Sequence, residues 1–415
     1  MLRIVFRVSM LLLVGTSLQA ANITAPFEVE QSATLPKKVR NPRFRNVFIM
    51  MEDRFSDAGK VEPLAAKLNR PITFKEIINN QPDETQKNLV RGTLLANGIS
   101  EDGIAGSTTG DVNTTVNVML PTLAYGVNER LTMAVAVPVY KVSIRSGAGF
   151  ARADDGQRFV DGAAASNTMK ANEAADKLNN AVAMKLTKLD YQPLKDEDFT
   201  AIGDVRVAGK YRVYRDGKNT FALKPVLTLP TGHAPNADKV VDIPTGDGQY
   251  DFGSSVIWDR QLLSWLRFGA MGNYTVQFPD RIDRRLPTSS TDSLSADKEL
   301  VGRDSGDQMA AGASLTYGSL TRGFSLGAGY NFQFMNKASF KGEKYPVERY
   351  QLLEAQNPLQ SLHSATVMAG FGTIDWFKEK KFVYPFQAFL AYSHPFKGRN
   401  VVAADVYSAE LVMFF

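Results

Sequence analysis

Histidines are the side chains of this chain best suited to proton transfer near neutral pH. The sequence contains three, His233, His363 and His394, and they lie far apart. None belongs to a His-Glu-x-x-His segment of the kind that binds zinc. A Ser/His pair would have to use His363 or His394 with a serine that the sequence does not identify. The chain is therefore predicted not to be an enzyme.

Two aspartates in the segment TGDGQYDFG, Asp247 and Asp251, are the best candidates for binding a cation. The segment lacks the ladder of ligands found in an EF-hand loop, so a turn is the simpler interpretation. The chain has no Cys, which excludes disulfides, Cys-based zinc sites and thiol catalysis. The sequence predicts no metal and no cofactor.

The C-terminal stretch from Val401 to Phe415 has the pattern of a β-strand. Counting back from the end, Phe415, Met413, Leu411 and Tyr407 fall on one face of an extended strand. A terminal strand of this kind that ends in Phe resembles the assembly signal of bacterial outer-membrane β-barrels. That resemblance implies recognition by the barrel-assembly machinery. The last strand of a soluble β-sandwich would show the same alternation.

The N-terminus has the features of a secretory signal. Arg3 and Arg7 precede a short apolar run, VSMLLLV, which small residues follow up to Ala20 and Ala21. The run is too short for a membrane-spanning helix, which needs about 20 apolar residues. We expect residues 1–20 to be a signal peptide and residues 21–42 to be a periplasmic lead.

Composition and charge narrow the class of protein only slightly. Hydrophobic residues make up 44% of the chain and charged residues 22%, values that suit a β-barrel because its lipid-facing and lumen-facing residues alternate. The formal net charge is only +5, and removal of the signal with Arg3 and Arg7 would lower it. This weak charge does not suggest a nucleic-acid binder.

From Thr114 onward the chain reads as a series of β-hairpins. Apolar and polar residues alternate in each strand, as in DVRVAGKYRVYR from Asp204 to Arg215. Short turns near residues 127, 216, 262, 320 and 379 alternate with long loops at about 56–111, 145–201, 231–248, 279–306 and 336–360. Only the bridge PFKGRN, before the last strand, is shorter than its place in this alternation predicts. Residues 163–189 have helical composition and are expected to form a small helix over their loop or a gating lid.

This alternation of connections is typical of outer-membrane barrels with periplasmic turns and extracellular loops. Eleven strands are readable, and a twelfth near Phe44 to Asp53 would return both termini to the same side. The sequence therefore predicts an all-β, antiparallel, up-and-down transmembrane barrel of about 12 strands over residues 43–415, with short helices in its loops. Its place would be the bacterial outer membrane. Aromatic residues at strand ends would form interfacial girdles: Tyr125, Trp258, Trp265, Tyr317, Trp376 and Phe415.

If the apolar face of each strand meets lipid, the other face lines the lumen. The predicted lining, which would also bind substrate, is polar and mostly basic: Arg206, Lys210, Arg212, Lys224, Arg267, Asn273, Gln277, Asn331, Gln333 and Glu410, with Gln387 beside them. Such a lining favours water and anions. Alternatively, these side chains pair with acids such as Asp204, Asp251 and Glu410 and fill a narrow barrel.

Three arginines in the third long loop, Arg281, Arg284 and Arg285, are candidates for binding the phosphates of lipopolysaccharide. A solvated, charged loop accounts for them equally well.

Three segments resemble a known family: LPTLAYGVNERLTMAVAVPVY (from Leu120), IGDVRVAGKYRVY (from Ile202) and LTLPTGH (from Leu227). They are similar to the signatures of outer-membrane barrels named for the meta-cleavage (MetA) pathway of phenol degradation, distantly similar to long-chain fatty-acid channels. The resemblance covers about residues 110–415. It implies passage of hydrophobic or aromatic compounds across the outer membrane, and it carries over no ligand-contacting residue.

Several functions remain open from the sequence. The main hypothesis is a channel for passive uptake of small hydrophobic or aromatic compounds, including anions. The alternatives are a structural or adhesive barrel with a plugged lumen, a general small-solute porin and a barrel enzyme. Expected partners are outer-membrane lipid, lipopolysaccharide, the assembly machinery and a small solute.

Overall fold

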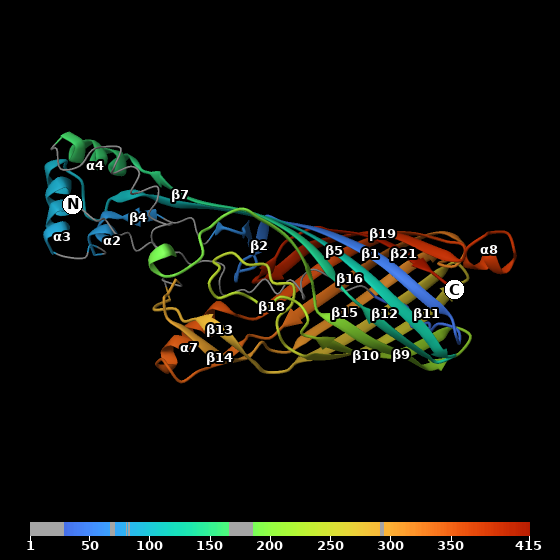
Figure 1. Cartoon of the computed structure of the whole chain (residues 1–415). Coiled ribbons are helices and arrows are strands. Elements are labelled where there is room, and N and C mark those ends of the chain that lie inside the picture. The colour runs from blue at the N-terminus through green and yellow to red at the C-terminus, as the bar shows by residue number, and fades with distance from the viewer. Residues whose placement is uncertain (1–28, 67–70, 80, 82–83, 166–185, 291–293) are drawn as a thin grey trace.

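The computed structural model describes residues 29–66, 71–79, 81, 84–165, 186–290 and 294–415. Short connections join neighbouring strands at one end of the molecule, which we call the turn end (Figure 1). It comprises residues 129–130, 216–218, 264–265, 319–322 and 373–385. Long segments join the strands at the opposite end, the loop end. In the described part of the chain no helix is long and apolar enough to cross a membrane.

Twelve antiparallel strands close into a barrel, as predicted. The wall strands are β1 (Arg40–Met51), β5 (Ile104–Asn128), β6 (Leu131–Ala136), β9 (Val205–Arg215), β10 (Asn219–Leu229), β11 (Asp251–Leu263), β12 (Leu266–Gln277), β15 (Gln308–Gly318), β16 (Gly323–Met335), β18 (Gln360–Gly372), β19 (Phe386–Arg399) and β21 (Val406–Met413). Strand β1 closes the ring because Phe44 faces Pro121 of β5 on one side and Leu411 of β21 on the other. Closure pairs the backbone groups around the wall, as a sheet in lipid requires.

The first strand is amphipathic in an unusual way. Its inward side carries Arg43 and Arg45 near the turn end but Val47, Ile49 and Met51 near the loop end, where these three are buried. Neither face is uniformly apolar because the strand crosses from the lumen to a packed core. The predicted strand near Phe44 is confirmed, although it begins at Arg40.

Three wall strands continue past the barrel at the loop end. The upper part of β5 pairs with β7 (Val139–Arg152), and β7 pairs with β8 (Glu197–Ile202). Pro138 and Gly203 interrupt the two strands that continue as β7 and β8. Gly203 donates its N–H to the Pro138 carbonyl at 2.8 Å, and a Cβ there would lie 2.3 Å from the Tyr140 ring. Parts of the predicted loops at 56–111 and 145–201 are therefore β-strand, and the loops are shorter than predicted.

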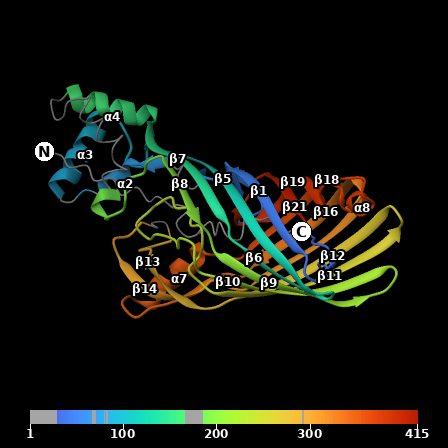
Figure 2. The same cartoon turned by 45° about the vertical axis from the view of Figure 1, so that its right-hand side comes forward.

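Small elements lie at the loop end in three groups (Figures 1 and 2). At the far end of the long strands β5 and β7 lie β4 (Pro71–Thr73), α2 (Phe74–Asn79), α3 (Glu84–Ala96) and α4 (Asp154–Ala165). A small sheet closer to the barrel consists of β2 (Asp53–Phe55), β3 (Val61–Pro63) and β20 (Val401–Val402). The third group consists of β13 (Asp280–Arg285), β14 (Lys298–Asp304), β17 (Ser339–Lys341) and α7 (Val347–Gln356). Most of the predicted helical segment 163–189 lies outside the described residues.

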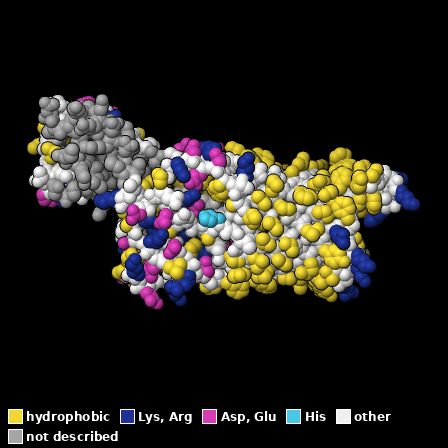
Figure 3. All heavy atoms as spheres, in the orientation of Figure 1, with side chains coloured by type: hydrophobic (Ala, Val, Ile, Leu, Met, Phe, Trp, Pro, Cys, Tyr) yellow, Lys and Arg dark blue, Asp and Glu magenta, His cyan; other side chains and the backbone are white. Residues whose placement is uncertain are grey.

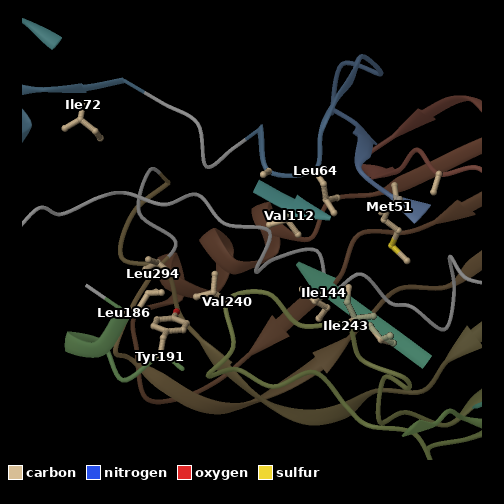
Figure 4. Close-up of a cluster of buried hydrophobic side chains, with 14 of the residues drawn as sticks. Met51, Leu64, Ile72, Val112, Ile144, Leu186, Tyr191, Val240, Ile243 and Leu294 are labelled. Atoms are coloured by element: carbon tan, nitrogen blue, oxygen red, sulfur yellow. The ribbon is translucent and has the colours of Figure 1, made fainter. Parts of the chain in front are cut away.

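Two apolar cores hold these elements in place. The larger runs from Ile72 and Leu64 to Val112, Ile144 and Leu186, so it joins strand ends to the loops above them (Figure 4). The smaller packs β13, β14, β17 and α7 around Val301 and Leu286, which are fully buried.

The outer face of the barrel is apolar. Leu223, Val256, Leu326 and Leu390 are between 42% and 65% exposed, although they lie in the middle part of their strands. Apolar side chains form a broad band over the barrel, while charged side chains gather toward its ends (Figure 3). A monomer in water rarely exposes such an area, whereas lipid would cover it.

Two connections differ from the expected ones. The bridge PFKGRN is not a separate loop, because β19 extends through it to Arg399 and the chain then turns at Asn400, whose φ is 55°. The short turn near residue 379 instead contains a helix, α8 (Ile374–Lys378). Its Trp376 packs against Phe371 and Phe382, with ring centroids 5.8 and 6.5 Å apart.

Candidate channel lumen

The predicted lining residues lie on the face of the wall opposite the apolar band. The register of the wall strands places them on the same side of the sheet as buried residues such as Ala222, Ile257 and Met271. These inward positions are Arg206, Lys210, Arg212, Lys224, Arg267, Asn273, Gln277, Asn331, Gln333 and Glu410. Several contact other wall residues: Glu410 pairs with Arg43 at 2.9 Å, Asn331 donates to Thr366 Oγ1 at 3.0 Å, and Asn273 donates to Ser255 Oγ at 3.0 Å.

A segment of the chain itself lies inside the lumen. Residues 29–39 precede β1 and extend from the turn end into the barrel. Lys38 donates its N–H to the Gly126 carbonyl at the rim, whereas Val29 packs against Ala222, Ile257 and Met271 about halfway along the wall. This part of the predicted periplasmic lead is therefore within the barrel. The lead was misplaced because no local pattern in the sequence marks its long-range contacts.

An ion-pair cluster holds the segment at its inner end. The carboxylate of Glu30 pairs with Lys210 at 2.9 Å and with Lys224, which approaches its other oxygen. Lys210 also donates to the Gln31 carbonyl at 2.8 Å. Burial raises the pKa of Glu30, but the two lysines outweigh it and hold that pKa well below its usual range. Glu30 is therefore ionised at neutral pH. Lys210 and Lys224, two of the predicted lining residues, are thus paired with the segment.

Further contacts fix the rest of the segment. Ser32 is fully buried and donates from both its N–H and its hydroxyl to Asp259 Oδ2, at 2.6 and 2.7 Å. Leu35 donates its N–H to Thr132 Oγ1 at 2.8 Å. At the inner end, a Cβ at Gly269 or Gly312 would lie only 3.2 or 2.9 Å from the methyl groups of Val29. The lack of side chains at these glycines makes room for the segment.

Comparison with known proteins identifies the family. A family model described as "Putative MetA-pathway of phenol degradation" matches residues 97–348, more than half of the chain. The chain belongs to this family. The resemblance seen in the sequence is thus confirmed, and the structure described here is that of a family member with a segment inside its barrel. No curated protein matches the chain.

Solved structures support the fold. The COG4313 outer membrane channel from Pseudomonas putida F1 matches with a TM-score of 0.53 and 12% identity, over 94% of this chain and 100% of that one. The Ralstonia pickettii toluene transporter TbuX matches with a TM-score of 0.37 and 10% identity, over 97% and 99% of the two chains. The Pseudomonas putida toluene transporter TodX gives 0.34 and 11%, over 96% and 97%. The last two scores are too low to carry an argument.

Several carboxylates lie close together at the loop end of the lumen. Asp247 lies in a turn, where its Oδ1 accepts the N–H of Gln249 at 2.9 Å and its Oδ2 accepts Gln277 Nε2 at 3.2 Å. Its own N–H donates to Asp204 Oδ2 at 3.3 Å. Nearby, Asp251 Oδ1 and Gln277 Oε1 are buried without a hydrogen-bond partner among the described residues. In the same residues no group of carboxylates and histidines is arranged to hold a metal ion.

This arrangement predicts a pH dependence of stability at the loop end. Burial raises the pKa of Asp204 and of Asp247, and for Asp247 the nearby carboxylates raise it further. A carboxyl whose pKa is higher in the folded state destabilises the fold above that pKa, and the penalty disappears as the pH falls toward the unfolded value. We expect hydrogen exchange of residues 231–250 to be slower at pH 5 than at pH 8, after correction for the intrinsic rate.

The substitution Asp247→Asn should flatten this pH dependence. Asn keeps the oxygen that Gln249 needs, and rotation of the Gln277 amide would let its unpaired Oε1 accept the new N–H. Equal protection at both pH values in the wild-type protein would show that these carboxyls do not destabilise the loop end.

Arg285 is not available to lipopolysaccharide. Its guanidinium is 4% exposed, pairs with Asp238 at 2.6 Å and lies 4.0 Å above the Tyr191 ring. It also donates to the carbonyls of Leu189 and Ser295, at 2.6 and 2.9 Å. The arginine joins three connecting segments, a role that sequence analysis missed because the partners are far apart in the chain. Arg281, by contrast, is exposed.

Removing the Arg285 guanidinium should loosen the loops while leaving the barrel intact. Arg285→Met would leave the buried carbonyls of Leu189 and Ser295 without this donor, at a cost of about 1–3 kcal/mol each, while Asp238 would keep its ion pair with Lys298 at 3.0 Å. We expect hydrogen exchange in residues 186–196 and 231–248 to accelerate, with no change in the gel shift between boiled and unboiled protein. Arg281→Met is the matched control. Unchanged exchange in Arg285→Met would contradict the assigned role.

Two of the histidines make separate contacts with other side chains. His363 is hydrogen-bonded through Nδ1 to Tyr330 Oη at 2.6 Å and lies among aromatic rings, and His394 contacts Asp405 at 2.7 Å. The sequence also contains one Gly-x-Ser-x-Gly pattern, GFSLG at residues 323–327. Its Ser325 is buried within β16, whereas a hydrolase nucleophile sits on a sharp turn between a strand and a helix.

Proposed function

We propose that this protein is an outer-membrane channel through which small hydrophobic or aromatic compounds, including anionic ones, enter the periplasm. The observation that carries the proposal is a closed barrel with an apolar outer band in a chain that belongs to the phenol-degradation family. The matched structure with a TM-score above 0.5 is described as an outer membrane channel, which agrees with this assignment.

In this proposal the turn end faces the periplasm and the loop end faces the medium, where lipopolysaccharide surrounds it. The terminal strand then lies where the assembly machinery would meet it. Tyr407, Leu411 and Phe415 are exposed on the outside and Met413 is partly buried. The Phe415 backbone pairs with Arg40, with N–H to carbonyl distances of 2.8 and 2.9 Å.

Residues 29–39 keep the channel closed at rest. They contact the inner faces of β6, β9, β10, β11 and β12, and so obstruct one part of the lumen. A general porin has a water-filled channel, which this obstruction disfavours. Passage of a solute would require the segment to shift. In this proposal the polar lumen residues serve in pairing and positioning, as Lys210 and Lys224 do with Glu30.

Uptake by whole cells tests this function. Cells with and without the protein are given labelled phenol, benzoate or an alkane, with labelled sucrose as the control for a general porin. We expect the protein to increase uptake of phenol or benzoate severalfold and to leave sucrose unchanged. If all four solutes enter at the same rate with and without it, the protein is instead a structural or adhesive barrel. Increased sucrose uptake would indicate a porin.

A further inference from the structure

A small cavity lies at the loop end, among β13, β14, β17 and the residues that precede β18. Its volume is about 10 Å³, enough for one water-sized atom or group. Arg284, Arg303 and Ser305 line it on one side, and Met335 and Phe340 belong to its apolar wall. None of these residues contacts the segment inside the lumen in any interaction that the structure records, so the cavity is distinct from the channel site.

Two hydrogen-bond donors at the cavity have no acceptor. Arg303 is 3% exposed and binds Asp280 through Nε at 2.9 Å and through Nη2 at 2.7 Å, but its Nη1 is buried without a partner in the described structure. Ser305 is 2% exposed, and its hydroxyl is likewise unpaired among the described residues. Buried donors are rarely left unsatisfied, because each costs free energy relative to water.

Arg284 adds a second positive charge at the cavity. Within the described residues it makes no hydrogen bond and no ion pair. The carboxylates near it are those of Asp280, which Arg303 already engages, and Asp242, and neither contacts the Arg284 guanidinium among the described residues. Burial and the charge of Arg303 lower the pKa of Arg284 to about 10, so the side chain is still protonated at pH 7.

We propose that this cavity binds a single small monovalent anion, chloride. Such an ion would accept hydrogen bonds from Arg303 Nη1 and Ser305 and would offset the charge of Arg284. A water molecule would satisfy the donors but would interact less strongly with the two guanidinium groups. The small volume excludes a hydrated ion. By joining β13 to the end of β14, the anion would stabilise the loop end.

Bromide, which mimics chloride and scatters X-rays anomalously, locates the site directly. The full-length protein is crystallised with bromide, and its unfolding temperature is measured at increasing bromide and constant ionic strength. We expect an anomalous peak among Arg284, Arg303 and Ser305, and a saturable rise in unfolding temperature. In Arg284→Gln the half-saturating concentration should increase about tenfold or more, as loss of a charge-assisted hydrogen bond predicts.

Arg281→Gln, an exposed change on the same strand, is the matched control and should shift that concentration less than about twofold. If Arg284→Gln does not fold, Ser305→Ala gives the second test, with a smaller weakening. Formate is larger than a single atom and should leave the bromide peak in place, and loss of the peak on adding formate would contradict a site for one atomic ion. No peak in the wild-type protein, with the same unfolding temperature in all salts, would show that the cavity holds only water and would overturn the proposal.

Discussion

Replacing Glu30 by Gln is expected to open the reconstituted barrel. The substitution leaves Lys210 and Lys224 close together and without their shared counterion, and these lysines are only 16% and 21% exposed. Breaking a buried ion pair in this way costs about 3–5 kcal/mol. That is enough to change the ratio of seated to displaced segment by more than about a hundredfold. Planar-bilayer recordings should therefore show a large rise in conductance over the wild-type protein.

Ala33→Ser, on an exposed position of the same segment, is the control and should leave the conductance unchanged. Mild acid should not mimic the Glu30 variant. Because the pKa of Glu30 is held well below its usual range, its contribution to stability is complete above the unfolded value and is lost only when the pH falls through the lower folded value. We therefore expect wild-type barrels to stay closed at pH 5. Equal conductance of Glu30→Gln and wild type would refute the role of this ion pair.

A charge on the outer face should be nearly as damaging. Leu223 lies in the middle of β10, is 42% exposed and points away from the lumen. A Lys near the bilayer midplane of a barrel costs about 2–4 kcal/mol. We expect Leu223→Lys to lower the denaturant midpoint of the protein in lipid vesicles and to reduce the fraction that migrates as a folded band without boiling.

Val226→Lys is the matched control, because Val226 faces inward on the same strand and its neighbour at the same parity, Lys224, is already basic. Its cost should be well below that of Leu223→Lys. Similar losses in both variants, or a larger loss in Val226→Lys, would mean that the assignment of inner and outer faces is wrong.

The wall of the barrel could be predicted because the alternation of side chains within each strand determines which residues meet lipid. In a closed sheet every second residue meets lipid, so the alternation in β9 alone places Val207 outside and Arg206 and Lys210 inside. Strand β1 was harder to recognise, because its inward face is polar near Arg43 and apolar near Ile49. Only the need for an even number of strands pointed to it.

The contents of the lumen could not be predicted in this way. Glu30 is separated from Lys224 by 194 positions, and residues 29–39 have no periodicity that would indicate their environment. The basic inner face was itself a signal: Lys210 and Lys224 on neighbouring strands require a counterion. The sequence contains many carboxylates that could serve, so the partner could be identified only from the fold. Arg285 is similar, since its acceptors come from segments about 50 and 95 residues away.

A reversible cross-link between the segment and the wall tests the account most directly. The chain has no Cys, so the pair Val29→Cys and Gly269→Cys would be its only thiols. A Cβ at Gly269 would lie 3.2 Å from a methyl carbon of Val29, close to the geometry of a disulfide. We predict that oxidised proteoliposomes exclude labelled benzoate, which is an anion at neutral pH, and that a reductant restores its entry to the wild-type rate. If the oxidised, fully cross-linked protein admits benzoate as fast as the reduced one, the segment does not control passage through this barrel.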